Sequence, residues 1–230
     1  MPRDLENRSA TVAIIGAGPL GRWLALATAR AGFRVLLEDV MPANLHHAQE
    51  YIRQQFNVES GGKNAGPSTP HPNDEDLSLG TPDPSAVADS AQDDIVLRAQ
   101  DDSIVAITFV STIEDAVREA DLAIDCVPDE LESKLEILWL LDRMAPPRTV
   151  LAPPTTRLSI ADLANCTYRP AKCVAIAAEA SSLAANAGGE ILLRTTSRTS
   201  PETVALVDHF WRQLGFTPRF EPDPAEQPAS

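Results

Sequence analysis

The sequence predicts an α/β fold in which helices cover both faces of a doubly wound, mostly parallel sheet. Short β-branched, apolar runs alternate with longer helix-forming segments along the chain. The first run, residues 11–15, leads into a glycine-rich turn and a helix, and a second run at 33–37 completes a β-α-β unit. With 230 residues, 43% of them hydrophobic, the chain suffices for one domain with a core, or for two small ones.

Strands are expected where a short apolar run ends at glycine, proline or an acidic residue. The expected strands are 11–15, 33–37, 104–109, 122–127, 149–152, 173–178, 191–194 and 216–220. Helices are expected where helix formers or helical apolar spacing follow such a run, with Gly32 as a C-cap, Pro42 in a first turn and Ser200 as an N-cap. The expected helices are 19–31, 42–56, 113–119, 131–144, 160–164 and 201–214.

Residues 59–102 differ from the rest of the chain in composition. They are rich in glycine, proline, serine and aspartate and hold few large apolar side chains, so they cannot bury enough surface to offset chain entropy. We expect a disordered acidic insertion there, with at most a weak helix over 86–100. It would divide the domain into a first part, 1–58, and a remainder, 103–220, followed by a flexible tail at 221–230.

The formal net charge is −14, from 33 acidic and 19 basic residues, which argues against a nucleic-acid partner. The chain has no apolar run long enough to span a membrane, and its N-terminus lacks the apolar core of a signal peptide. The three cysteines, Cys126, Cys166 and Cys173, lack metal-binding spacing. We expect free thiols in a cytoplasmic protein, with no metal site and no membrane partner.

A GxGxxG motif, Gly16-Ala17-Gly18-Pro19-Leu20-Gly21, joins the first expected strand to the first expected helix. Gly16 would allow the tight turn, Gly18 would let a diphosphate approach the backbone, and Gly21 would let helix and strand pack closely. The helix N-terminus then offers amide donors and a partial positive charge to phosphates.

Asp39 lies 18 residues after Gly21, at the end of the second strand. A carboxylate at that position binds the adenosine ribose of NAD and repels the extra phosphate of NADP. Glu38 is the competing candidate, although alternation along the strand points it to the opposite face. The motif and Asp39 together predict a Rossmann-like dinucleotide-binding domain that holds NAD.

Five ordered blocks of the sequence resemble the NAD-binding domain of the 3-hydroxyacyl-CoA dehydrogenase family, from residue 11 to about 220. The blocks are VAIIGAGPLGRWLALATARAGFRVLLEDV, STIEDAVREADLAIDCVPDELESK, LAPPTTRLSI, RPAKCVAIAAEAS and TSPETVALVDHFWRQLGFTP. The resemblance adds Val127, Pro128 and Lys134 to the expected cofactor-binding residues. It also implies oxidation of 3-hydroxyacyl-CoA to 3-oxoacyl-CoA in fatty acid metabolism.

In that family a histidine paired with a glutamate takes the hydroxyl proton, while a hydroxyl side chain helps to hold the substrate oxygen. Carried over by position, the hydroxyl is Thr156 and the partner glutamate is Glu190, but the histidine position is Ala177. A methyl group cannot accept a proton. Glu179, two residues further on, is the nearest alternative base, or else a solvent-facing carboxylate at a strand end.

None of the four histidines, His46, His47, His71 and His209, replaces the missing base by position. Two functions therefore remain open: a dehydrogenase with altered chemistry, or a catalytically inactive module that senses NAD or binds a partner. We expect the family's helical C-terminal domain to be absent. A homodimer or a separate helical chain would then complete an acyl-CoA site.

Overall fold

The computed structural model describes residues 10–61, 94–98, 104–178, 183 and 188–226. Its larger sheet is built from β1 (Thr11–Ile15), β2 (Arg34–Glu38), β3 (Ile95–Arg98), β4 (Ile104–Val110), β5 (Leu122–Asp125) and β6 (Val150–Leu151). The strand order is β3-β4-β2-β1-β5-β6, and every pair is parallel except β3 with β4. The sheet confirms the expected α/β, mostly parallel architecture.

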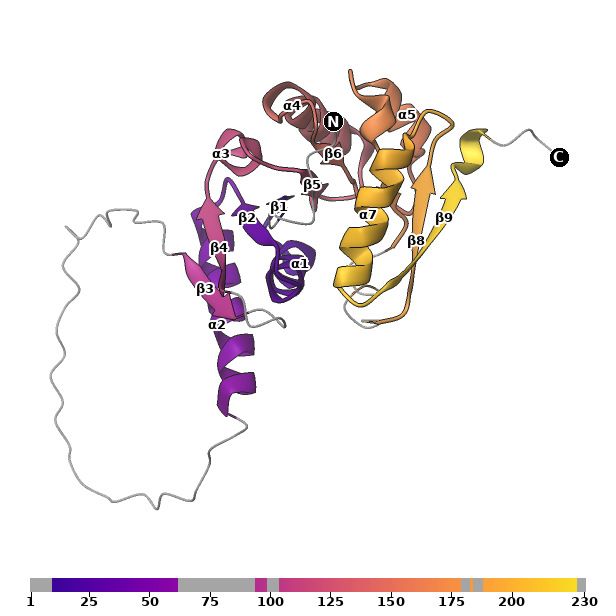
Figure 1. Cartoon of the computed structure of the whole chain (residues 1–230). Coiled ribbons are helices and arrows are strands. Elements are labelled where there is room, and N and C mark those ends of the chain that lie inside the picture. The colour runs from indigo at the N-terminus through magenta and orange to yellow at the C-terminus, as the bar shows by residue number, and fades with distance from the viewer. Residues whose placement is uncertain (1–9, 62–93, 99–103, 179–182, 184–187, 227–230) are drawn as a thin grey trace, which may run out of the picture.

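A smaller sheet continues from the β6 edge of the larger one (Figure 1). It consists of β7 (Ala175–Ile176), β8 (Glu190–Thr195) and β9 (Thr217–Pro222). Isolated parallel bridges, Leu151 to Cys173 and Pro154 to Ile176, join it to the larger sheet. The expected strands at 173–178, 191–194 and 216–220 therefore exist, with shifted ends, in a sheet of their own.

Helices cover both faces of the larger sheet (Figure 1). They are α1 (Pro19–Arg30), α2 (Pro42–Gly61), α3 (Ile113–Val117), α4 (Leu131–Met144), α5 (Ile160–Asn165) and α7 (Pro201–Gln213), with short 3-10 turns η2 (Pro170–Lys172) and η3 (Pro224–Glu226). One buried apolar cluster lies under α1, α2 and α7, and the other under α3, α4 and α5. Among the described residues, no helix has both the length and the apolar character needed to cross a membrane.

The expected insertion boundaries, 59–102, are wrong at both ends. Helix α2 runs on to Gly61, and residues 95–98 form β3 where a weak helix was expected. The run Ile-Val-Leu-Arg pairs antiparallel with β4, and Ile95, opposite Ile107, is buried against the sheet. An apolar run this short satisfies its backbone better by pairing with an open sheet edge than as one helical turn. Residues 62–93 and 99–103 lie outside the described part.

The expected flexible tail, 221–230, is also wrong at its start. Strand β9 extends to Pro222, and η3 follows it. Asp223 is 2% exposed, and its Oδ2 accepts hydrogen bonds from Ser159 Oγ at 3.0 Å and from the Ala161 amide at 2.8 Å. These bonds tie the tail to the N-terminus of α5, an attachment that composition alone does not signal. Residues 227–230 are not described.

The strand order reverses its direction between β1 and β5. From β1 the chain moves outward through β2 to β4, and then returns to build β5 and β6 on the other side of β1. In open α/β sheets, ligands bind in the crevice outside the carboxyl ends of the strands at such a switch point. The fold therefore brings the turn after β1 and the loop after β5 to one potential site.

We predict that Gly21→Ala destabilises the fold far more than Gly18→Ala. A Cβ on Gly21 would lie 1.8 Å from the Gly16 carbonyl oxygen, whereas one on Gly18 meets nothing within 4 Å. Backbone must move to accommodate the first, so we expect a loss of about 3 kcal/mol in the free energy of unfolding, against less than about 1 kcal/mol for the second. Chemical denaturation of both variants measures this difference, and equal losses would contradict it.

Candidate functional site

The turn between β1 and α1 has the geometry that the glycine motif predicts. Gly16 adopts a φ of +99°, a left-handed conformation that glycine tolerates and other residues rarely adopt. Its amide donates to the Glu38 carbonyl at 2.8 Å, which ties the turn to the end of β2. Gly21 packs against the Gly16 backbone, and the space beside Gly18 is open.

The N-terminus of α1 is suited to an anion. Gly18 is its N-cap residue and provides no side-chain hydrogen bond, Pro19 follows in the first turn, and that turn carries no acidic residue. The first-turn amides therefore keep their capacity to donate, and no carboxylate of that turn competes with an anion for the positive end of the helix dipole. Together with the open cradle at Gly18, these features fit the diphosphate of a dinucleotide.

Asp39 lies at the end of β2, as expected, but its carboxylate is held by the protein. It is 8% exposed, and its Oδ2 accepts from the Ala17 amide at 2.8 Å. Its Oδ1 accepts from the Met41 amide at 2.9 Å, and Asn44 Nδ2 lies 3.1 Å from both oxygens. Asp39 thus connects the glycine turn to the start of α2, a role that the motif does not reveal.

Glu38 is buried beside Asp39 and is 2% exposed. Leu37 belongs to the apolar cluster under α1, whereas Leu36 belongs to the cluster under α3, so alternation places Glu38 on the α3 face. None of the described residues offers its Oε1 a hydrogen bond. Burial, and then the neighbouring Asp39 charge, raise the pKa of Glu38 to about 7. This carboxyl is thus kept neutral up to nearly neutral pH.

The loop after β5 is fixed by a buried ion pair. Lys134 Nζ lies 3.2 Å from Asp125 Oδ2 and donates to the carbonyls of Asp125 and Val127, each at 3.1 Å. Desolvation raises the pKa of Asp125 to about 6, although Lys134 lowers it. Lys134 is 0% exposed. In this structure its ammonium holds the loop that carries Val127 and Pro128. Its expected contact with the cofactor stays a prediction.

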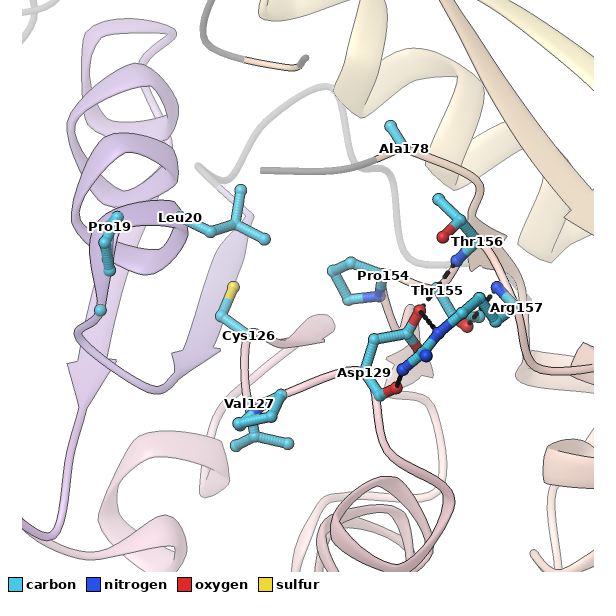
Figure 2. A pocket seen from close by; sticks show the side chains of 12 residues that line it. Pro19, Leu20, Cys126, Val127, Asp129, Pro154, Thr155, Thr156, Arg157 and Ala178 are labelled. Carbon is cyan, nitrogen blue, oxygen red and sulfur yellow. Dashed lines mark hydrogen bonds and ion pairs between the residues drawn. The ribbon is translucent and has the colours of Figure 1, made fainter. Parts of the chain in front are cut away.

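A cavity of about 670 Å³ opens between these segments. Figure 2 shows Pro19 and Leu20 of α1 on one side and residues 154–157, which follow β6, on the other. The loop residues 126–129 and Ala178, just after β7, complete its lining. Of the expected cofactor residues, Gly18, Pro19, Leu20, Val127 and Pro128 border this cavity.

The polar end of the cavity is organised around Asp129 (Figure 2). Its Oδ2 accepts from the Thr156 amide at 3.1 Å, and its carbonyl accepts from the Arg157 guanidinium. Thr155 Oγ1 accepts from the amide of Leu158 at 2.9 Å and shapes the same turn. Burial, and then the charge of Asp125, raise the pKa of the Cys126 thiol far above its ordinary range, so this lining cysteine is not a thiolate.

The expected catalytic residues lie on different segments of the structure. Thr156 borders the cavity, but Glu190 is exposed at the start of β8, where its Oε1 lies 3.2 Å from Arg219 Nη1. Glu190 does not line the cavity, but it lies two residues before Leu192, whose carbonyl accepts from the Ala177 amide at 2.9 Å, so its expected pairing with a catalytic base stays a prediction. Ala177 lies at the end of β7, and Glu179 lies outside the described residues.

Several lining residues were missed by the sequence reasoning. Cys126 and Asp129 flank the expected Val127-Pro128 at the carboxyl end of a parallel strand, so their position alone could have indicated them. Arg157 and Ala178 follow strands of the β6–β7 region in the same way. Asn44 carried no sequence signal, because its importance depends on where Asp39 points.

The comparisons with known proteins agree with this geometry. The profile described as "3-hydroxyacyl-CoA dehydrogenase, NAD binding domain" matches residues 11–219. A probable 3-hydroxybutyryl-CoA dehydrogenase from Bacillus subtilis (strain 168) is 25% identical over 165 residues, covering 71% of this chain and 46% of that protein. A 5-formyl-3-hydroxy-2-methylpyridine 4-carboxylate 5-dehydrogenase from Mesorhizobium japonicum is 24% identical over 207 residues, covering 90% of this chain and 55% of that protein.

Solved structures show the same fold. The (S)-3-hydroxybutyryl-CoA dehydrogenase PaaH1 from Ralstonia eutropha superposes with a TM-score of 0.69 at 19% identity, covering 94% of this chain and 64% of that one. An NAD⁺-dependent pyridine-carboxylate dehydrogenase gives a TM-score of 0.67 at 24% identity, with 94% and 59% covered. The chain spans about half the length of the two curated relatives above.

We predict that Lys134→Met destabilises the fold by about 3–5 kcal/mol, because it leaves the Asp125 carboxylate buried without its counter-charge. The double variant Asp125→Asn/Lys134→Met should recover part of that loss, since no buried charge then remains. Chemical denaturation measures both free energies of unfolding. If the double variant is as unstable as the single one, charge compensation is not the role of Lys134.

We predict that stability decreases as pH rises from about 5 to 8, and that Glu38→Gln reduces this decrease to the smaller part that Asp125, whose pKa is raised to about 6, contributes at the lower end of the range. The pKa of Glu38 is raised from 4.5 to about 7 on folding, so the folded state holds its proton where the unfolded state releases it. Above the folded pKa the variant should be about 2–3 kcal/mol more stable than the parent, and near pH 4 the two should match. Denaturant unfolding across this range measures the difference, with the exposed Glu136→Gln as control.

Proposed function

The chain belongs to the 3-hydroxyacyl-CoA dehydrogenase family through its NAD-binding domain, and on that premise we propose that it works as an NAD-binding module with little of the family's dehydrogenase rate. The observation that carries the proposal is the cavity at the switch point. Its cofactor side has an open glycine turn and an uncapped helix N-terminus. Its opposite side has no imidazole among the described residues that line it.

On the side of the cavity formed by the glycine turn and the loop after β5, each part of NAD would contact a few residues. The amides of Gly18 and the first turn of α1 would hold the diphosphate, and Asp39 would face the adenosine ribose. Val127 and Pro128, fixed through Lys134, would border the nicotinamide half. NAD supplies a hydride acceptor when bound. The chain's part is to hold and orient it and to exclude water from the apolar walls of the cavity.

The side of the cavity opposite the glycine turn has no imidazole among the described residues that line it. We align Ala177 with the catalytic histidine of the family, and its methyl has no acceptor. Among the described lining residues the ionisable ones are Cys126, Asp129 and Arg157. The thiol is held protonated, and a guanidinium does not accept protons. Asp129 Oδ2 accepts from the Thr156 amide, but its buried Oδ1 has no hydrogen-bond partner among the described residues, so this carboxylate is the one described lining group that could accept a proton. Removing a general base typically costs about 10²–10⁴-fold in rate.

A second candidate is an active 3-hydroxyacyl-CoA dehydrogenase completed by another chain. The observation in its favour is that Thr156 borders the cavity, where its hydroxyl could hold a substrate oxygen. A homodimer or a separate helical chain would then cover an acyl-CoA. This version also places the protein in cytoplasmic fatty acid metabolism. The two curated relatives carry the names of different substrates, an acyl-CoA and a pyridine carboxylate, so family membership leaves the substrate class open.

Calorimetry with the purified chain and NADH tests the first proposal, followed by addition of acetoacetyl-CoA while NADH absorbance is recorded. We expect a dissociation constant below about 1 mM and no oxidation of NADH above the buffer rate. Gly18→Asp is the control, because a carboxylate in the open cradle repels phosphates and should abolish binding. Turnover would favour the second candidate, and absence of NADH binding at millimolar concentration would overturn the proposal.

A further inference from the structure

The amide of Asn44 covers the open side of the Asp39 carboxylate. Its Nδ2 lies 3.1 Å from Oδ1 and 3.1 Å from Oδ2, so it sits across both oxygens. The other contacts come from two backbone amides, Ala17 to Oδ2 and Met41 to Oδ1. A carboxylate has about four acceptor positions, and these contacts use them. The orientation of the Asn44 amide is physically required, because its oxygen would repel both carboxylate oxygens.

A ribose diol that binds Asp39 must take the acceptor positions that Asn44 uses. The Ala17 amide is fixed by the glycine turn, and the Met41 amide by the start of α2, so neither can leave without moving backbone. Asn44 is different, because it is exposed and only its side chain is involved. Its side chain can rotate towards solvent without moving the backbone. Asn44 is therefore the contact that a ligand can displace.

We propose that Asn44 is an affinity- and specificity-determining residue of the cofactor site, which caps Asp39 in the free protein and competes with the adenosine ribose. This inference rests on the proposed NAD binding and adds a residue that the family motif does not contain. A ligand that must first displace a hydrogen bond to a charged group binds more weakly. This lowers the affinity for NAD, because both free hydroxyls of its adenosine ribose donate to Asp39.

The same contact lowers the preference for NAD over NADP. A carboxylate whose acceptors are filled by an amide presents less of its negative charge to a phosphate on the ribose. Uncovering it strengthens the attraction for a diol but not for a phosphate, because two anions repel. Removing the Asn44 amide therefore raises the ratio of NAD affinity to NADP affinity.

The test is calorimetric titration of the full chain and of Asn44→Ala and Asn44→Leu with NADH, NADPH and ADP-ribose. Alanine is the best helix former, and leucine keeps the branched shape and the number of side-chain heavy atoms of asparagine while removing its donor, so both variants should fold. We expect both to bind NADH and ADP-ribose about three- to tenfold more tightly, with NADPH binding no tighter than in the parent. Gln54→Ala, which removes an exposed amide further along α2, is the matched control and should change nothing.

The outcomes separate this inference from the proposed function. If the parent and all variants fail to bind NADH, the proposed function fails and the inference fails with it. If the parent binds NADH but both Asn44 variants bind it equally or more weakly, the inference alone is overturned. If only Asn44→Ala binds more tightly, the gain comes from space and not from the released carboxylate, which also overturns it.

Discussion

A single carboxylate, that of Asp39, sets the arrangement of the cofactor end of the sheet. It joins the turn after β1 to the start of α2 through two backbone amides, from a position almost closed to solvent. The Gly16 amide adds a bond to the end of β2. These bonds fix the direction of the glycine-turn amides before any ligand arrives. A site that is ordered in advance loses less entropy on binding, which is how a small cradle can hold a dinucleotide.

The loop after β5, on the other side of the switch point, is also held in place by a buried charged side chain, that of Lys134. Lys134 offers its donors to one carboxylate and two carbonyls, so the β5–α4 loop is held by contacts that would be lost together. Glu38 lies on the same face of the sheet as Asp125, in register on either side of Ile15, yet none of the described residues gives its Oε1 a hydrogen bond. At this end of the sheet, the buried Asp125 carboxylate therefore has Lys134 as its counter-charge. The buried Glu38 carboxyl instead has its pKa raised to about 7, which favours its neutral form. Burying such groups lowers the stability of the fold, and Asp125, Lys134 and Glu38 are buried where they position the site.

The sequence was a good guide where local chemistry decides structure. The β1–α1–β2 unit follows from an apolar run, a glycine turn and a helix that starts at Pro19. It was a poor guide where distant segments decide. Ile95–Arg98 is a strand only because the edge of β4 is available, and Asp223 is ordered only because α5 starts beside it. The uses of Asp39, Lys134 and Asn44 likewise depend on side-chain directions that no motif encodes.

The two sides of the cavity are held in place by different sets of hydrogen bonds. The phosphate-binding turn rests on neighbouring segments, the end of β2 and the start of α2, and within the described residues its hydrogen bonds come from segments before β6. The chemical side is assembled from residues 154–157 and the end of β7, held by Asp129. Because the two sides have separate supports, we expect a substitution on the side formed by residues 154–157 and the end of β7 to leave the glycine turn in place. Cofactor binding and chemistry on a substrate therefore depend on different contacts of this fold, and each can be altered without the other.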